Sequence, residues 1–190
     1  MGKDDLRNAK YVIDIGPVPS LPVEGSDMRF PVGRIYCVGR NYAEHAKEMG
    51  HDPNREPPFF FMKAANSIVQ SGSTIAYPVA SKDVHHEIEM VVAIAKGGKD
   101  IPVEKALDHV WGYAVGLDMT RRDIQGEAKK MGRPWEMGKS FDESAPVTAL
   151  TGRNGEIGAD SSKLFPISHG RPSFFASPWM SRRVMSSPTA

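Results

Sequence analysis

The chain contains a single cysteine, Cys37, so the sequence rules out an internal disulfide. Long apolar runs are lacking as well, and none approaches the roughly 18 residues that a membrane-spanning helix needs. The N-terminal stretch MGKDDLRNAK is charged and has no apolar segment of the kind found in signal peptides. The 24 basic and 23 acidic residues leave a net charge of +1, which favours neither nucleic acid nor an anionic membrane as a partner. We therefore expect a cytoplasmic protein that binds neither nucleic acid nor membrane.

Acidic residues are also missing from the last part of the chain. Residues 161–190 hold none, and they contain eight serines and four prolines with no apolar period of 2 or 3.6 residues. Nearer the N-terminus, residues 14–33 carry four prolines and three glycines, a composition typical of an extended arm or linker. The sequence therefore predicts an N-terminal extended arm over 1–33, a folded domain over 34–158 and an irregular tail over 159–190.

The folded domain mixes short strands and helices in an irregular order. Apolar and alternating patterns predict strands, whereas capping residues and terminal glycines predict helices. Strands are expected over 34–39, 59–63, 84–95 and 111–119, helices over 41–50, 102–110 and 120–132, and loop or turn over 133–147. Thr120 is the expected cap of the last helix, with Asp123 as its capping-box partner. Because strands outnumber helices and no regular βαβ repeat occurs, the predicted fold class is α+β and β-rich.

Two glutamates stand near the start of one expected strand, in the stretch HHEIEMVVAIAK. Glu87 and Glu89 are two positions apart, so both side chains point to the same face, about 6 to 7 Å apart. Asp118 adds a third carboxylate at the end of another apolar strand. Hard cations such as Mg²⁺, Mn²⁺ or Ca²⁺ prefer oxygen ligands, so the three acids are candidate metal ligands. The alternatives are a solvated strand end neutralised by Lys82 or Lys96, and a helix-capping role for Asp118.

One pair of residues on the expected helix 41–50 is a candidate general base. His45 and Glu48 are three residues apart and share a face of the helix. A carboxylate beside an imidazole orients the ring and raises its basicity, which suits the activation of water. The alternative is an exposed helix surface with a weak local pair.

A second group is basic and amide-bearing. Arg122 and Gln125 share a face of the helix that follows Asp118, and Lys139 comes next in the stretch GKSFD. Such side chains bind carboxylates or stabilise an oxyanion when they line a cavity. On an ordinary helix surface, however, arginine and lysine are simply solvated.

Four stretches together resemble the fumarylacetoacetate hydrolase superfamily in order and approximate spacing: YCVGRNYAEHAKEMG, HHEIEMVVAIAKGGKDI, GYAVGLDMTRRDIQ and GKSFDESAPV. The segment GHDPNREPPFFFMK resembles the bacterial branch that includes the fumarylpyruvate hydrolases of gentisate breakdown. Acylpyruvate hydrolases and oxaloacetate decarboxylases are close relatives. The resemblance implies a homodimer with a mixed β-roll core. It also implies a metal-dependent hydrolase that cleaves the C–C bond of an acylpyruvate and releases pyruvate.

The same resemblance implies a role for each candidate residue. It implies Mg²⁺ or Mn²⁺ held by Glu87, Glu89 and Asp118, water activated by His45 and Glu48, and substrate and intermediate contacted by Arg122, Gln125 and Lys139.

Two features depart from the family pattern. Ala64 follows Lys63 where the family usually has Lys-Pro. Nothing after about residue 158 resembles the family's C-terminal strands with their Gly-Thr-Pro loop, and the change in composition motivates the hypothesis of a shifted or miscalled reading frame. The missing strands motivate one alternative to the hydrolase, a catalytically incompetent family member. A second alternative keeps the same metal site and is a β-keto acid decarboxylase of the oxaloacetate type.

Overall fold

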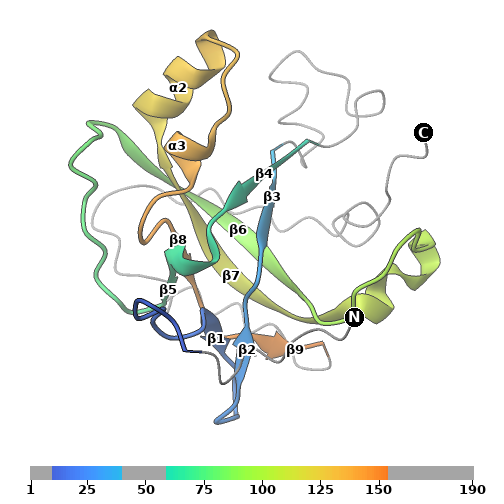
Figure 1. Ribbon diagram of the computed structural model, residues 1–190. Coiled ribbons are helices and arrows are strands. Elements are labelled where there is room, and N and C mark those ends of the chain that lie inside the picture. The colour runs from blue at the N-terminus through green and yellow to red at the C-terminus, as the bar shows by residue number, and fades with distance from the viewer. Residues whose placement is uncertain (1–9, 40–58, 154–190) are drawn as a thin grey trace.

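The structure is a computed structural model that describes residues 10–39 and 59–153 (Figure 1). Strands, 3-10 helices and α-helices follow one another irregularly along these residues. In chain order they are β1 Ser20–Pro22, β2 Arg29–Pro31, β3 Ile35–Val38, β4 Phe60–Lys63, η2 Ala65–Ser67, β5 Ile68–Gln70, β6 Val84–Ile94, η3 Val103–His109, β7 Val110–Arg121, α2 Arg122–Lys130, α3 Glu136–Lys139, β8 Ala145–Val147 and β9 Thr151–Gly152. The helix expected over 41–50 and the tail expected over 159–190 lie outside the described residues.

A five-stranded mixed sheet is the largest unit of the fold. Its strand order is β5-β8-β7-β6, with β9 also paired to β7. β6 and β7 are antiparallel along almost their whole length, β8 is antiparallel to β7, and β8 is parallel to β5. Figure 1 shows β6 and β7 as a long pair that crosses the molecule, with α2 and α3 near one end and β1, β2 and β9 near the other. The predicted α+β, β-rich class is confirmed, although the described strands form no closed barrel.

The hydrophobic core lies beneath this sheet, where the β1–β2 hairpin packs on it. Leu150 is fully buried there with Leu21, Ala93, Ala114 and Val147. The Leu150 amide donates to the Pro22 carbonyl at 2.8 Å, and the Glu24 amide donates to the Leu150 carbonyl at 2.9 Å. The region predicted as an extended arm thus contributes a strand pair and a buried leucine to the core.

The structure corrects the prediction of loop and turn over 133–147. This segment contains the short helix α3 and the strand β8. Pro146 weakens any strand signal in the sequence, because proline cannot donate a ladder hydrogen bond. β8 forms because its backbone pairs in parallel with β5 and its three residues are buried. Local propensity predicts neither this pairing nor this burial.

The predicted cap of α2 is also wrong. Thr120 is fully buried inside β7, which runs on to Arg121, and α2 begins at Arg122 with no side-chain cap. Asp123 accepts hydrogen bonds from the Ser81 hydroxyl at 2.7 Å and from the backbone amide of Lys82 at 2.9 Å. It therefore ties the start of α2 to the segment before β6 instead of closing a capping box.

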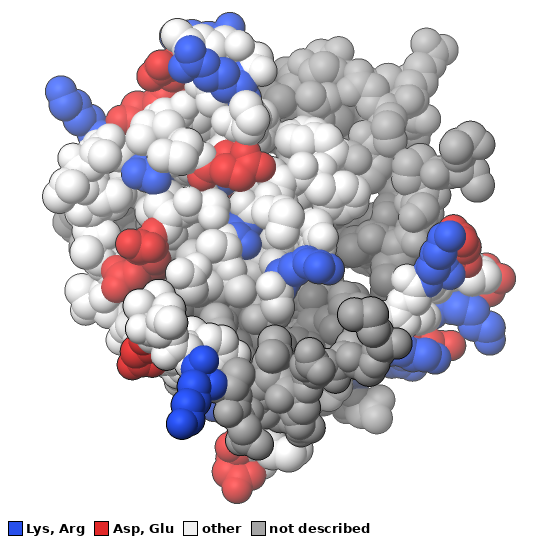
Figure 2. Space-filling view, in the orientation of Figure 1, with Lys and Arg blue, Asp and Glu red and all other residues white. Residues whose placement is uncertain are grey.

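Charged side chains are scattered among uncharged ones on the face shown in Figure 2. Among the described residues on that face, neither sign of charge fills a large area. Among the described residues, no helix has both the length and the apolar character needed to cross a membrane.

Removing the centre of the core should destabilise the fold. Leu150→Ala leaves a cavity in a fully buried site, and such changes cost about 2 to 5 kcal/mol of unfolding free energy. Leu107→Ala is the matched control, because 41% of Leu107 is exposed. Urea denaturation of both variants measures the difference. Equal losses in the two variants would contradict the assignment of the core.

Candidate functional site

Two of the three predicted acids stand directly opposite each other. Glu87 of β6 pairs in register with Asp118 of β7, and Glu89 pairs with Gly116 two positions further along. In an antiparallel pair, opposite residues point to the same face, so the three carboxylates share one side of the sheet. Asp118 is only 6% exposed and lies inside β7, not at its end as predicted. The structure therefore brings the three acids together in a partly buried place.

The ammonium group of Lys139 lies between two of these carboxylates. It donates to Glu87 Oε2 at 2.7 Å, to Asp118 Oδ2 at 2.8 Å and to Thr120 Oγ1 at 2.7 Å. The Lys139 side chain is 2% exposed. A buried ammonium costs much free energy unless all three of its protons are bonded, and here each has an acceptor.

The predicted pair on α2 also reaches this place. Arg122 Nη2 donates to Glu87 Oε1, and Arg122 Nη1 donates to Gln125 Oε1 at 2.7 Å. Gln125 is buried, whereas 31% of the Arg122 side chain remains exposed. The cations that neutralise Glu87 are thus Lys139 and Arg122, not the lysines that flank β6.

Lys63 is a member of the site that the sequence prediction missed. Its Nζ lies 2.8 Å from Asp118 Oδ1 and donates to the Met119 carbonyl at 3.0 Å and to the Lys139 carbonyl. Its side chain is 2% exposed. Three acidic and three basic side chains therefore meet here.

A sequence signal for Lys63 was available in the stretch FFFMK. The segment was predicted as a buried strand, but only one face of β4 is buried. Phe60 and Met62 are 49% and 38% exposed, whereas Phe61 and Lys63 are 7% and 3% exposed. A lysine in phase with the buried phenylalanine points inward, where it needs a buried anion as its partner.

The surroundings shift the carboxyl pKa values in opposite directions. Burial raises the pKa of Glu89 to about 7, and the charges of Asp118 and Glu87 add to the rise. No described residue gives Glu89 a hydrogen bond. Burial also acts to raise the pKa of Glu87, but hydrogen bonds and charge from Lys139 and Arg122 outweigh it and hold that pKa below its ordinary value. Among the described residues, no cation donates a hydrogen bond to Glu89, unlike Glu87 and Asp118.

The donor chemistry fits a hard divalent cation. Three carboxylates supply oxygen ligands, and the buried Oδ1 of Asp118 lies 2.8 Å from the Lys63 ammonium. Within the described ranges, however, no three His, Cys, Asp or Glu side chains are arranged to hold a metal ion. The oxygens of Glu87 and Asp118 are directed at Lys139 instead. The metal-binding role of the three acids stays a prediction.

The predicted general base, His45 with Glu48, lies outside the described residues. Cys37 lies close enough to the site to feel its charges, but burial raises the pKa of its thiol to about 12, and the charge of Asp118 adds to the rise. Since only the thiolate is a strong nucleophile, Cys37 is unsuited to nucleophilic catalysis.

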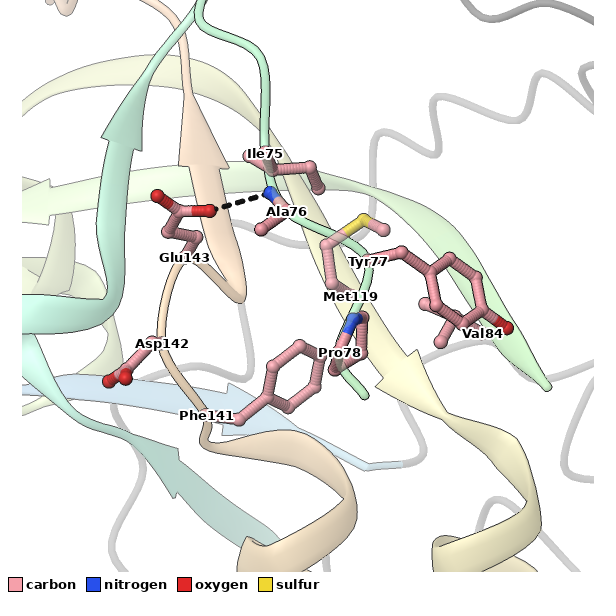
Figure 3. A pocket seen from close by; sticks show the side chains of 9 residues that line it. All are labelled: Ile75, Ala76, Tyr77, Pro78, Val84, Met119, Phe141, Asp142 and Glu143. Atoms are coloured by element: carbon pink, nitrogen blue, oxygen red, sulfur yellow. Dashed lines mark hydrogen bonds between the residues drawn. The ribbon is translucent and has the colours of Figure 1, made fainter. Parts of the chain in front are cut away.

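A separate hollow lies near the loop that follows α3 (Figure 3). Met119 and Val84, which line it, alternate with Asp118 and His85 and so point to the opposite face of the β6–β7 pair. Its other lining residues are Ile75, Ala76, Tyr77, Pro78, Phe141, Asp142 and Glu143. Figure 3 shows Glu143 turned to the backbone amide of Ala76, which it bonds at 2.8 Å. The hollow is thus not the carboxylate site.

The family described as "Fumarylacetoacetate (FAA) hydrolase C-terminal" matches residues 34–163 of the chain. Among solved structures, the chain is similar to a fumarylpyruvate hydrolase from Pseudomonas aeruginosa in complex with Mn²⁺ and pyruvate. The two are 58% identical with a TM-score of 0.70, over 75% of this chain and 63% of that one.

Curated relatives carry names of a different chemistry. Oxaloacetate tautomerase FAHD1, mitochondrial, of Mus musculus is 47% identical over 116 residues, which cover 61% of this chain and 52% of the relative. Oxaloacetate decarboxylase, mitochondrial, of Dictyostelium discoideum is 43% identical over 117 residues, which cover 62% and 54%. The chain therefore spans about half the length of these relatives.

Close packing of α3 on α2 should hold Lys139 in place. A Cβ atom at Gly138 would lie 2.9 Å from the backbone nitrogen of Gln125, so Gly138→Ala must push the two helices apart. We expect a loss of about 1 to 3 kcal/mol in unfolding free energy. Gly126→Ala is the control, because its Cβ would meet nothing within 4 Å and alanine favours the helix. Thermal melting compares the two, and a neutral G138A would contradict this packing.

The raised pKa of Glu89 should make the stability of the metal-free protein depend on pH. The folded state holds the proton more tightly than the unfolded chain, so this contribution is complete below the ordinary pKa of 4.5 and is lost as pH rises towards about 7. The pKa of Glu87 lies below 4.5, so its titration changes the stability only at pH values below this window. In the presence of a chelator, the melting temperature of the unaltered chain should fall across the window relative to Glu89→Gln. Parallel pH profiles would contradict the shift.

Proposed function

Because the chain belongs to the fumarylacetoacetate hydrolase family, we propose that it hydrolyses the C–C bond of an acylpyruvate such as fumarylpyruvate with the help of a divalent cation. The observation that supports this most is the group of three carboxylates, Glu87, Glu89 and Asp118, beside the buried Lys139. Similarity to a fumarylpyruvate hydrolase that was crystallised with Mn²⁺ and pyruvate supports the substrate class.

Glu87, Glu89 and Asp118 would hold Mg²⁺ or Mn²⁺, with Ca²⁺ as a further candidate of the same hard class. When bound, such an ion supplies Lewis acidity to the 2-oxo acid end of the substrate. A bound cation would stabilise the ionised form of Glu89 most, because no cation among the described residues donates a hydrogen bond to it.

Two cationic side chains of the site suit the substrate's negative charge. Arg122 is fixed by Gln125 and Glu87, and its partial exposure leaves the guanidinium open to a substrate carboxylate. Lys139 brings a full positive charge into a water-poor place, where that charge can stabilise the oxyanion formed at the attacked carbonyl, with the Gln125 amide as a hydrogen-bond donor. Removing one such donor costs about 3 to 4 kcal/mol of the activation barrier.

His45, oriented by Glu48, would take a proton from water, and the hydroxide would attack the distal carbonyl of the acylpyruvate. The C–C bond then breaks, the acyl group leaves as a carboxylic acid, and the proton goes to the carbon of the departing pyruvate. Water is the only co-reactant, so the reaction is balanced as a hydrolysis.

Oxaloacetate is the second candidate substrate. Two of the curated relatives, 47% and 43% identical, are named for its tautomerisation and its decarboxylation. Decarboxylation would use the same metal site and Lys139 but needs no base that activates water, so His45 separates the two proposals.

His45→Ala should abolish hydrolysis of fumarylpyruvate and leave metal binding intact. We expect Mn²⁺ to raise the melting temperature of the unaltered chain and of H45A alike, because a ligand that binds only the folded state stabilises it. Asp118→Asn should lose both turnover and the Mn²⁺ shift, whereas Asp108→Asn, with 56% of its side chain exposed, should lose neither. Absorbance assays with fumarylpyruvate and oxaloacetate measure turnover.

Each other result has a definite meaning. Near-normal hydrolysis by H45A contradicts its role as the base. Turnover of oxaloacetate alone assigns the second candidate. Stabilisation by Mn²⁺ without turnover of either substrate makes the chain a catalytically incompetent family member, and the absence of any Mn²⁺ shift contradicts the metal site.

Assembly and location stay predictions. We propose a homodimer, which light scattering on the purified chain tests by its molar mass. The curated relatives named above are mitochondrial, whereas the sequence predicts a cytoplasmic protein.

A further inference from the structure

Lys63 reaches the carboxylates from outside the sheet that carries them. It is the last residue of β4, which pairs only with β3 among the described strands, whereas the acids stand on β6 and β7. Its ammonium nevertheless lies 2.8 Å from Asp118 Oδ1, and its side chain is 2% exposed. Burying a lysine costs free energy, so an ammonium that leaves the β3–β4 pair to contact the five-stranded sheet indicates a structural or functional role.

The other contacts of Lys63 join the two elements that build the site. Its ammonium donates to the carbonyl of Met119, the residue after Asp118 on β7, at 3.0 Å. It also donates to the carbonyl of Lys139, the last residue of α3. The Lys63 side chain thus bonds the backbone next to Asp118 and the backbone of Lys139, the two residues that form the ion pair.

A second bond supports the same junction. The backbone amide of Ala64 donates to Ser140 Oγ at 2.9 Å, so the residues that follow Lys63 and Lys139 are tied together as well. The end of β4 and the end of α3 are therefore held at two successive positions.

We propose that Lys63 is a positioning residue of the cation site: it holds the carboxylate of Asp118 and the backbone of Lys139 in place beside Glu87 and Glu89, where a divalent cation would bind. This inference rests on the proposed metal site. A purely electrostatic role predicts the opposite effect of removing Lys63, because a positive charge near a bound cation repels it and its loss would tighten binding.

Mn²⁺ titration of the 190-residue chain, followed by electron paramagnetic resonance of the free ion, tests the proposal. Lys63→Met keeps the length of the side chain and removes its charge and its donors. We expect the Kd for Mn²⁺ to rise about 10-fold or more, the usual effect of removing a group that orients a metal ligand. Lys105→Met, at an exposed lysine on η3, is the matched control and should keep the affinity of the unaltered chain.

Lys63→Arg separates positioning from charge. It keeps the positive charge, but its planar fork cannot place one nitrogen among three acceptors, so we expect an affinity between those of K63M and the unaltered chain. Circular dichroism shows whether each variant is folded. If K63M does not fold, K63R is compared directly with the unaltered chain, and an equal Kd overturns the proposal.

Two results overturn the inference in different ways. Unchanged or tighter Mn²⁺ binding by folded K63M removes the positioning role and leaves the proposed function standing. No Mn²⁺ binding by the unaltered chain removes the metal site itself, and the role of Lys63 falls with it.

Discussion

The pairing of Glu87 with Asp118 across the β6–β7 ladder is the constraint on which the site depends. Like charges directly opposite each other in an antiparallel pair destabilise it, and burial of Asp118 makes the repulsion worse. The two strands can keep this register only if cations reach the pair. Lys139 does so by bridging both carboxylates, so the long central ladder and the buried ammonium require each other.

That requirement explains the arrangement of the smaller elements. α3 has a single turn and could not persist alone, yet it delivers Lys139 because Gly138 lets it approach α2 closely. α2 delivers Arg122, and the paired strands β3 and β4 deliver Lys63. Two helices that follow each other in the chain and a strand far from them in sequence thus converge on one face of β6 and β7.

How much of this the sequence predicts depends on the range of each interaction. Glu87 and Glu89 are placed correctly because the strand period of two is local, and Arg122 with Gln125 because the helical spacing is local. Thr120 is placed wrongly because a cap and a buried strand residue look alike until the partner of the strand is known. For Lys63, the strand period predicts an inward side chain but not its partner, since Asp118 lies 55 positions away in the chain.

The balance of charge bears on what the site can bind. Three acidic and three basic side chains neutralise one another when Glu89 is ionised, so a divalent cation would leave two positive charges in excess. An acylpyruvate that carries two carboxylates would restore neutrality, with Arg122 as the exposed contact for one of them. Cation and dianionic substrate would then bind more tightly together than apart, because each removes the unbalanced charge that the other creates. A substrate with one carboxylate would lack half of this coupling. Under the proposed function, the charge of the described side chains would therefore favour a substrate with two carboxylates.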